Sequence, residues 1–211
     1  MRIAVIGATG HTGQQVVEQA LGRGYDVTAL ARRPDLVPIE DVRLRVVRAD
    51  ALRAGGWMDA LGDADAVVST LGIGSSRQPT QLYSAGVAHV LQAMGTHHLR
   101  KLAVISAAPV AERDAQPFVE RRVLMPILDR VFGATYEDMR RMEALLERSE
   151  VDWISLRPPR LVNKAPTGHY RIDAHGPLRR ARSITVGDLA AALLDSLSRA
   201  DLYRRAVYVA N

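Results

Sequence analysis

Short apolar runs alternate with segments of helical periodicity along most of the chain. Arg2–Ile6 is an apolar run typical of a buried strand, and Val16, Val17, Ala20 and Leu21 follow it at helical spacing. The same patterns predict strands at 26–31, 42–47, 66–71, 102–106, 153–156 and 206–209, an extended segment at 168–172, and helices at 52–61, 80–94, 118–132, 136–149 and 186–197. Strands separated by helices in this way predict an α/β fold, a doubly wound parallel sheet with helices on both faces.

Domain organisation follows from the length and from the absence of a linker. The 211 residues suffice for one domain with a sizeable core, and we find no repeat or low-complexity segment. The order of elements is looser after the fifth strand. We therefore expect a single domain over residues 1–211, with a small C-terminal substrate cap at about 107–183.

The turn between the first strand and the first helix carries three glycines in seven residues. Its sequence is Gly7-Ala8-Thr9-Gly10-His11-Thr12-Gly13, a G-x-x-G-x-x-G spacing. Glycines allow a tight turn and close backbone approach, and a helix N-terminus offers free N–H groups to an anion. The motif predicts a site for a dinucleotide pyrophosphate. The alternative is a glycine-rich turn that only joins two packed elements.

The residues at the end of the second predicted strand indicate which dinucleotide the site binds. An NAD site places a carboxylate there, on the adenosine ribose, but this chain has Arg32 and Arg33 and no acidic residue before Asp35. Guanidinium groups match a phosphate, so we predict NADP(H) rather than NAD(H). The alternative is two exposed arginines without a role.

Ligands of parallel sheets collect at the carboxyl ends of the strands. After the third strand this rule selects Asp50 and Ala51, near the adenine, and after the fourth it selects Leu71 and Gly72, along the middle of the cofactor. We also expect cofactor contacts from the later strand ends, at Ile105, Ser106 and Pro158.

Composition and charge exclude several classes of function. The chain has no cysteine, which excludes disulfides, thiolate metal sites and cysteine nucleophiles. No apolar run approaches the roughly 20 residues of a membrane span, and the first strand begins at Arg2, so we expect no membrane association, no signal peptide and a cytoplasmic protein. Of the 28 basic residues only Lys101 and Lys164 are lysine, and the net charge is +5. Because the arginines are scattered, without a basic tail, we expect a small-molecule partner rather than nucleic acid, and a monomer or weak homodimer.

Several segments together resemble the atypical short-chain dehydrogenase/reductases, most closely the biliverdin-IXβ/flavin reductase branch with its NmrA-like relatives. The segments, which span nearly the whole chain, are Gly7–Gly13, Leu30–Arg33, Ala49-Asp50, Leu71-Gly72, Ser106-Ala107, Arg157-Pro158-Pro159, Thr167–Tyr170 and Ile184–Ala190. The resemblance implies a Rossmann domain that binds NADP(H) and reduces flavins, bilins or quinones by hydride transfer. It also implies that Ser106 lies near the nicotinamide and that Arg160 takes the substrate-side position after the proline pair, where the mammalian relative has a histidine.

The usual catalytic set of that superfamily is incomplete here. Conventional members combine a serine with a tyrosine and a lysine four residues apart, and neither lysine of this chain follows a tyrosine at that spacing. The nearest match is Tyr136 with Arg140, and we expect Tyr136 to be a helix-face residue rather than a catalytic acid. Ser106 is the candidate catalytic residue. Its alternative role is that of a strand-end serine that bonds the local backbone.

The histidines show no metal-ligand spacing, so we predict no metal. His169 is the only histidine expected near the substrate, where Arg160 would attract a carboxylate or phosphate. The alternative for His169 is that it only flanks a strand, and the alternative for Arg160 is a solvated charge on a loop.

The leading hypothesis is an NADPH-dependent reductase of a conjugated acceptor such as a flavin, bilin or quinone, in which the cofactor carries the hydride chemistry. A non-catalytic NADP(H)-binding regulator of NmrA type is the second hypothesis. A nucleotide-sugar epimerase or dehydratase is the third, weakened by the missing tyrosine–lysine pair.

Overall fold

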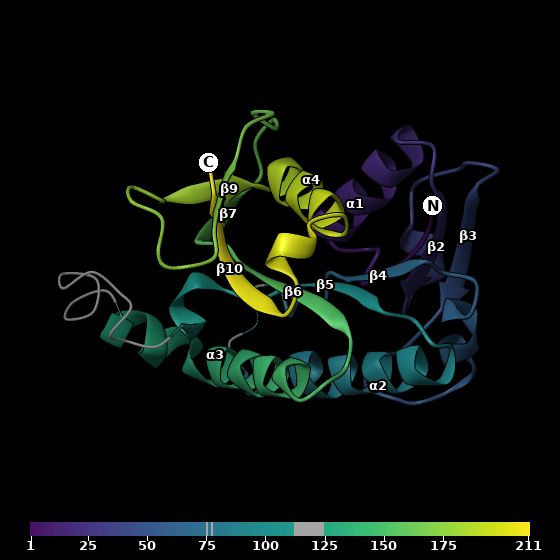
Figure 1. Cartoon of the computed structure of the whole chain (residues 1–211), viewed down its shortest axis with the longest axis horizontal. Helices are drawn as coiled ribbons and strands as arrows, with labels where there is room; N and C mark the ends of the chain where they lie inside the picture. Colours follow the sequence, from purple (N-terminus) through teal and green to yellow (C-terminus); the bar gives the residue numbers. More distant parts are fainter. Residues whose placement is uncertain (75, 77, 112–124) are drawn as a thin grey trace.

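Eight strands form one twisted sheet in the order β3-β2-β1-β4-β5-β6-β10-β8 (Figure 1). The computed structural model describes residues 1–74, 76, 78–111 and 125–211, with the backbone alone for 125–129. All neighbouring strands of this sheet pair in parallel except β8, which is antiparallel to β10. The strands are β1 Arg2–Ile6, β2 Asp26–Ala31, β3 Leu44–Arg48, β4 Ala66–Ser69, β5 Lys101–Ile105, β6 Asp152–Arg157, β8 Arg171–Asp173 and β10 Arg205–Ala210. Two further short strands, β7 Arg160–Val162 and β9 Ser183–Thr185, pair in parallel as a second sheet.

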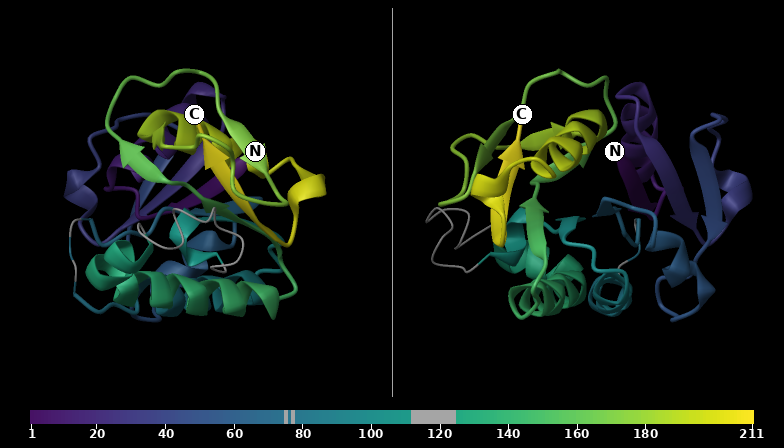
Figure 2. Two further views of the ribbon diagram at one scale, coloured as in Figure 1. Left: turned by 90° about the vertical axis from the view of Figure 1, so that its left-hand side faces the viewer. Right: turned by 45° about the vertical axis from the view of Figure 1, so that its right-hand side comes forward.

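Helices cover both faces of the large sheet, which confirms the predicted doubly wound fold. The helices α1 His11–Gly22 and α4 Val186–Ser196 pack together on one face, and α2 Leu82–Thr96 and α3 Met125–Glu147 run side by side on the other (Figures 1 and 2). Short 3-10 turns connect elements in the described part of the chain, at η1 Pro34–Leu36, η2 Gly56–Leu61, η3 Ala108–Val110 and η6 Ala200–Leu202.

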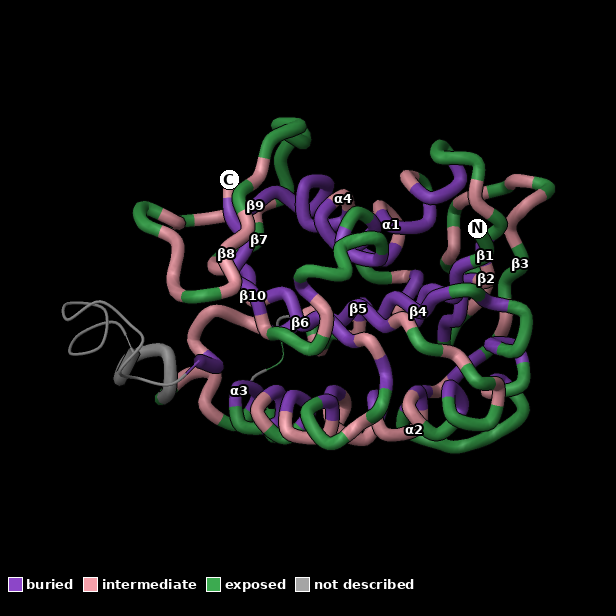
Figure 3. The backbone as a smooth tube through the Cα atoms, viewed as in Figure 1, coloured by how far each residue is buried: buried purple, intermediate pink, exposed green. Residues whose placement is uncertain are grey.

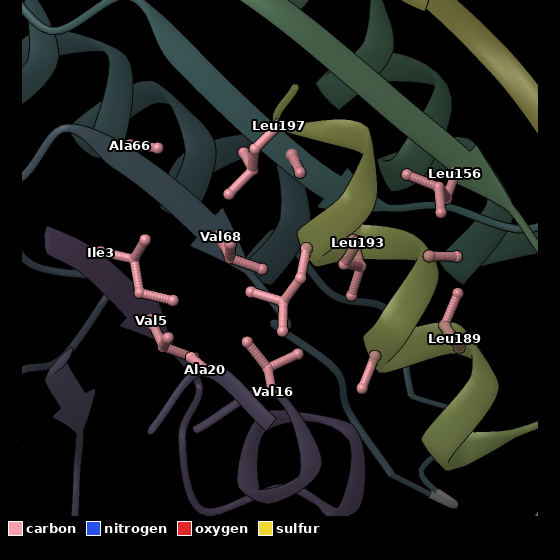
Figure 4. Packing of buried hydrophobic residues seen from close by; sticks show 14 of the residues in the cluster. Ile3, Val5, Val16, Ala20, Ala66, Val68, Leu156, Leu189, Leu193 and Leu197 are labelled. Atoms are coloured by element: carbon pink, nitrogen blue, oxygen red, sulfur yellow. The ribbon is translucent and has the colours of Figure 1, made fainter. Parts of the chain in front are cut away.

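The core has two layers because successive side chains of a strand point to opposite faces. In β1, Ile3 and Val5 join the layer under α1 and α4, whereas Ala4 and Ile6 join the layer under α2 and α3. Figure 3 shows the resulting buried strands with exposed outer helix faces, and Figure 4 shows Val16 of α1 and Leu193 of α4 over the strands of the first layer. Strands that are buried on both faces explain the continuous apolar runs of the sequence.

Some predicted elements differ from the structure. The helix expected at 52–61 is only the 3-10 turn η2, which begins at Gly56 after a glycine pair that disfavours a longer helix. The two helices expected at 118–132 and 136–149 are one continuous helix where the structure describes them, because the single Gly133 between them does not break a helix. Residues 118–124 of the first prediction lie outside the described residues. The paired strands β7 and β9 were not expected at all.

The predicted cap at about 107–183 must be narrowed. Of its described part, α3 covers the main sheet beside α2, and β6 lies inside that sheet between β5 and β10. Residues 112–124 of the predicted cap lie outside the described residues. Within the described part of the cap, only the segment after β6, residues 158–185, departs from the sheet, carrying β7 and β9 and returning β8 to its edge. We call this segment the flap.

A carboxylate of α3 caps the N-terminus of α2. Asp138 is fully buried, and its side chain accepts hydrogen bonds from the backbone N–H of Tyr83 (2.9 Å) and from the hydroxyl of Ser84. Arg141 donates a further hydrogen bond to it at 3.3 Å. A negative charge at the positive end of a helix dipole is favourable, so this contact fixes α2 against α3.

A second carboxylate of α3 joins the helix to the sheet. The buried Glu143 accepts a hydrogen bond from Ser155 at 2.8 Å and two from the guanidinium of Arg157, at 3.1 and 2.6 Å. The bidentate pair satisfies both charges inside the protein, which compensates their desolvation. Arg157 also lies over the ring of Tyr208 in β10, so α3, β6 and β10 are held together at this point.

Candidate functional site

A cleft of about 670 Å³ opens at the carboxyl ends of the parallel strands. It runs from the end of β2, past the turn that follows β1, to the ends of β5 and β6. Most of the residues predicted to bind the cofactor line it: Gly7, Thr9, Gly10, His11, Thr12, Arg32, Arg33, Ala51, Leu71, Gly72, Ile105, Ser106 and Pro158.

The turn after β1 is closed by backbone contacts that require glycine at two positions. Gly7 has φ of +86°, and a Cβ there would lie 2.9 Å from the carbonyl oxygen of Thr70. A Cβ on Gly13 would lie 2.3 Å from the carbonyl oxygen of Gly7 and 2.8 Å from Oγ1 of Thr70. The first turn of α1 therefore packs directly on the end of β1. Thr70 seals this contact by donating its hydroxyl to the carbonyls of Ile6 and Gly7, at 2.9 and 3.2 Å.

Among the described residues, no side chain caps the N-terminus of α1. The N-cap residue is Gly10, which has no side chain to accept a hydrogen bond, and no acidic residue lies in the first turn. By contrast, α4 is capped by Thr185 with Asp188 in its first turn. An uncapped helix N-terminus on a cleft offers N–H groups and a partial positive charge to an anion, so the turn fits a dinucleotide pyrophosphate.

Arg32 and Arg33 are exposed and line the cleft at the end of β2. Neither forms an ion pair with a carboxylate of the described chain, and no Asp or Glu lines the cleft among those residues. This end of the cleft can therefore receive a phosphate, but it lacks a carboxylate acceptor for ribose hydroxyls.

Three residues predicted to contact the cofactor do not line the cleft. Ala8 is completely buried in the core, and Gly13 is turned toward Gly7 and Thr70. The Asp50 carboxylate accepts a hydrogen bond from the backbone N–H of Leu52 at 3.1 Å, so it shapes its own turn. These three residues have structural contacts, and only Ala51 of the Asp50-Ala51 pair reaches the cleft.

The helices α2 and α3 supply lining residues that the sequence motifs missed. Tyr83, Tyr136 and Met139 all line the cleft and are largely buried. Burial raises the pKa of Tyr83, a backbone hydrogen bond from Ile73 partly opposes this, and the nearby Asp138 carboxylate adds a smaller increase, so the phenol stays protonated. Tyr136 lies on α3, as expected of a helix-face residue, and the face that carries it meets the cleft. No local motif marks these residues, because only the packing of α2 beside α3 brings them to the strand ends.

Arg140 does not replace the lysine of the usual catalytic set. Its guanidinium donates hydrogen bonds to the carbonyls of Val110 (3.3 Å) and Pro109 (3.4 Å) and pairs with Glu137. Arg140 therefore holds η3 against α3.

Ser106 lies directly after β5, on the wall of the cleft. Its backbone N–H donates to the carbonyl of Leu156 at 2.8 Å, which fixes the residue beside β6. Its side chain is only 2% exposed, and its hydroxyl has no hydrogen-bond partner within the described chain. An unpaired buried hydroxyl costs free energy unless a ligand satisfies it, so this oxygen is a candidate ligand contact.

The two residues predicted on the substrate side, Arg160 and His169, do not line the cleft. Along β7 the side chains alternate, and Leu161 is the residue that lines the cleft, so Arg160 points to the opposite face. His169 is exposed, and its carbonyl accepts hydrogen bonds from Asn211 and Thr167. The cleft wall near Arg160 is formed by Leu161 and Asn163, and no residue from 164 to 185 lines the cleft.

A buried carboxylate anchors the flap beside the cleft. Asp188 of α4 accepts hydrogen bonds from the backbone N–H groups of Thr167 and Gly168 and from the side chains of Thr185, Thr167 and Asn211, at 2.7–3.0 Å. Burial acts to raise the pKa of Asp188, but these hydrogen bonds outweigh it and lower the pKa to about 2. The ionised carboxylate thus holds the part of the flap that follows Asn163, a residue of the cleft wall.

Neither a metal site nor a membrane-spanning helix is found in the described part of the chain. No three His, Asp or Glu side chains there gather closely enough to hold a metal ion. None of the helices there combines the length and apolar character needed to cross a membrane.

The comparison with protein families agrees with this site. The NAD(P)H-binding family model matches residues 7–200, which is most of the chain. The protein belongs to this NAD(P)H-binding family. The match includes the uncapped turn, the arginine pair and the Asp188 anchor of the flap.

Relatives of this NAD(P)H-binding protein are distant. An uncharacterised chloroplastic protein of Arabidopsis thaliana is 26% identical over 84% of this chain and 65% of its own length. The uncharacterised protein YwnB of Bacillus subtilis is 26% identical over 93% of this chain and 92% of its own. The 3-diazoavenalumate denitrifying reductase of a Streptomyces species is 29% identical over 74% of this chain, but the match spans only 55% of that reductase.

Solved structures share the fold over the whole NAD(P)H-binding chain. The oxidoreductase ylbE of Lactococcus lactis superposes with a TM-score of 0.82 at 18% identity, covering 100% of this chain and 91% of that one. A Streptococcus pneumoniae protein provisionally named an NADH-flavin reductase superposes with a TM-score of 0.81 at 20% identity. The match covers 100% of this chain and 99% of that one. At these identities the likeness establishes the fold alone.

Two glycine substitutions separate folding from cofactor binding. We expect Gly13→Ala to lower the free energy of unfolding by about 2–3 kcal/mol, because its Cβ meets backbone. Gly10→Ala, whose Cβ has its nearest neighbour at 3.5 Å, should unfold like the wild type but bind NADPH at least about tenfold more weakly. Urea unfolding and NADPH fluorescence titration measure the two effects. Wild-type affinity in Gly10→Ala would contradict a phosphate site at this helix end.

The Asp188 anchor predicts an acid-sensitive component of stability. The folded-state pKa of Asp188, about 2, lies below the ordinary 3.8. Its ionised carboxylate therefore contributes ~2 kcal/mol to the free energy of unfolding above about pH 5, and this contribution is lost as the pH falls toward 2. The difference in unfolding free energy between wild type and Asp188→Asn should therefore narrow by about that amount from pH 6 to pH 2 in urea unfolding. Asp63→Asn, which alters an exposed carboxylate without an ion pair to a described residue, should show no such narrowing. A constant difference for Asp188→Asn would contradict the assignment.

Proposed function

We propose that this protein is an NADPH-dependent reductase of a flavin, bilin, quinone or similar conjugated acceptor. The observation that carries the proposal is the buried, unpaired hydroxyl of Ser106 on the cleft wall. A protein that only sensed the cofactor would need the dinucleotide half of the cleft. It would not need the further wall that Tyr136, Met139 and Leu161 give the cleft.

The cofactor half of the cleft fits a phosphorylated dinucleotide. The uncapped turn from Gly7 to Thr12 would hold the pyrophosphate, and Arg32 and Arg33 would hold the additional phosphate on the adenosine. A bound nicotinamide cofactor supplies the hydride chemistry.

The residues at the other end would orient the acceptor and exclude water from it. Tyr136, Met139, Pro158 and Leu161 form a wall suited to a flat ring, and Ser106 can donate a hydrogen bond to the acceptor or to the nicotinamide amide. No tyrosine–lysine relay is needed, because a reduced conjugated ring can take its proton from water. The Streptomyces relative is named a reductase, and the Streptococcus pneumoniae structure carries a flavin reductase name, which agrees with this class of reaction.

A non-catalytic NADP(H)-binding regulator remains the competing function, favoured by the engagement of Arg140 with the carbonyls of η3. The two functions separate in one assay. The protein is incubated with NADPH and FMN, riboflavin, biliverdin or quinones, and the nicotinamide absorbance is followed. Turnover of at least one acceptor supports the reductase, whereas tight NADPH binding without turnover of any acceptor supports the regulator.

Ser106→Ala refines this test. We expect the variant to lose at least about tenfold in kcat with little change in the dissociation constant of NADPH, because one ligand hydrogen bond is removed. Ser198→Ala, at an exposed serine outside the cleft, is the matched control. Equal turnover in both variants would exclude Ser106 from the reaction.

The arginine pair determines the expected cofactor preference. Arg32→Ala combined with Arg33→Asp should raise the dissociation constant of NADPH by about tenfold to a hundredfold, through loss of charge-assisted hydrogen bonds, and change that of NADH by less than about threefold. Arg45→Ala combined with Arg148→Asp makes the same charge change at exposed positions outside the cleft and should leave both constants unaltered. Titration with each cofactor measures this. An equal loss for NADPH and NADH would contradict an adenosine-phosphate site.

A further inference from the structure

The wall of the cleft that follows β4 and leads into α2 presents one polar side chain among the residues that the structure describes, the phenol of Tyr83. The lining residues of this wall are Leu71, Gly72, Ile73, Gly74, Leu82 and Tyr83. Thr70, just before it, already donates its hydroxyl to two carbonyls of the turn after β1. Because β4 lies between β1 and β5 in the sheet, a dinucleotide that runs from the glycine turn to Ser106 passes this wall.

The backbone of Tyr83 is fixed by α3. Its N–H donates to Oδ2 of Asp138 at 2.9 Å, and the hydroxyl of Ser84 donates to the other oxygen of the same carboxylate. Asp138 stands in α3 between Tyr136 and Met139, which line the proposed acceptor end of the cleft. The packing of α2 beside α3, visible in Figure 2, therefore places Tyr83 next to that end.

The phenol of Tyr83 reaches from α2 to the loop after β4. A Cβ on Gly72 would lie 4.0 Å from the phenol oxygen, which accepts a hydrogen bond from the backbone N–H of Ile73. A phenol can also donate one hydrogen bond, but none of the described residues accepts the proton of Tyr83. The residue is only 5% exposed, so water has little access to it. A ligand in the cleft can satisfy this donor, as it can satisfy that of Ser106.

We propose that the hydroxyl of Tyr83 binds the nicotinamide half of the cofactor, by donating a hydrogen bond to an oxygen of its ribose or of the adjoining phosphate. The inference rests on the proposed function, which takes NADPH as the cofactor, and adds a contact from α2 to those of the glycine turn and the arginine pair. Ribose and phosphate oxygens accept hydrogen bonds, and no lysine lines the described part of the cleft to serve them. The phenol keeps the proton that it donates, because burial raises the pKa of Tyr83.

A purely structural role of this phenol would act through the loop that it contacts. Gly72 and Ile73 of that loop also border a second hollow of about 420 Å³, together with Arg32. Arg32 lies at the end proposed for the adenosine phosphate. If Tyr83 only held the loop, its loss would therefore weaken binding of the adenosine end as well as of the nicotinamide half. A direct hydrogen bond to the nicotinamide half leaves the adenosine end unaffected, so binding of a cofactor fragment distinguishes the two roles.

Tyr83→Phe tests the proposal with NADPH and with 2′,5′-ADP, which carries the adenosine and its additional phosphate but has no nicotinamide half. Isothermal titration calorimetry on the full chain measures both dissociation constants. We expect Tyr83→Phe to raise the constant of NADPH about fivefold to tenfold, the effect of one lost hydrogen bond, and to leave that of 2′,5′-ADP within about twofold of the wild type. Retained binding of 2′,5′-ADP also shows that the variant is folded.

Tyr25→Phe is the matched control, because it removes the hydroxyl of a half-buried tyrosine outside the cleft, and it should leave both dissociation constants unaltered. Unchanged NADPH binding in Tyr83→Phe overturns the proposal. An equal loss for NADPH and 2′,5′-ADP also overturns it, because it assigns the phenol to the loop alone. Since the test needs no turnover, a protein that binds NADPH but reduces no acceptor contradicts the reductase, while the two binding constants still decide the role of Tyr83. A wild type that binds neither ligand overturns both proposals.

Discussion

The close contact between the end of β1 and the first turn of α1 is the constraint on which the site depends. The carbonyl of Gly7 occupies the space where a side chain of Gly13 would lie, and Thr70 of the neighbouring strand end ties the carbonyls of this turn together. Since Gly10 provides no cap, the helix end is left open to the cleft. A protein without a ligand for this position would gain stability from a capping side chain, so the open end indicates selection for anion binding.

Much of the fold could be predicted because its signals are local. The strands of a doubly wound sheet are buried on both faces, so β1, β4 and β5 read as short apolar runs, and the turn after β1 has a recognisable glycine spacing. The cofactor half of the cleft was predictable for the same reason: parallel strand ends meet at one edge, and Arg32, Arg33, Leu71 and Ser106 follow strands directly.

The acceptor half could not be predicted in the same way. Tyr83 and Tyr136 reach the cleft only because Asp138 fixes α2 beside α3, a contact between residues 55 positions apart. The choice of Leu161 rather than Arg160 depends on which face of the short strand β7 meets the cleft. That orientation is set by its pairing with β9, more than 20 residues later in the chain, and not by propensity.

The capping of α2 by Asp138 has a mechanical consequence for the cleft. Because α2 and α3 share this buried charge and Glu143 couples α3 to β6 and β10, neither helix can swing outward without exposing an unpaired carboxylate. The helical side of the cleft is therefore stiff. Room for ligands of different width has to come from the opposite border, at the short strands β7 and β9, and not from Thr167 and Gly168, which the buried Asp188 anchors. The range of acceptors that fit the cleft would then depend on how far the flap wall can move, rather than on the fixed shape of both walls.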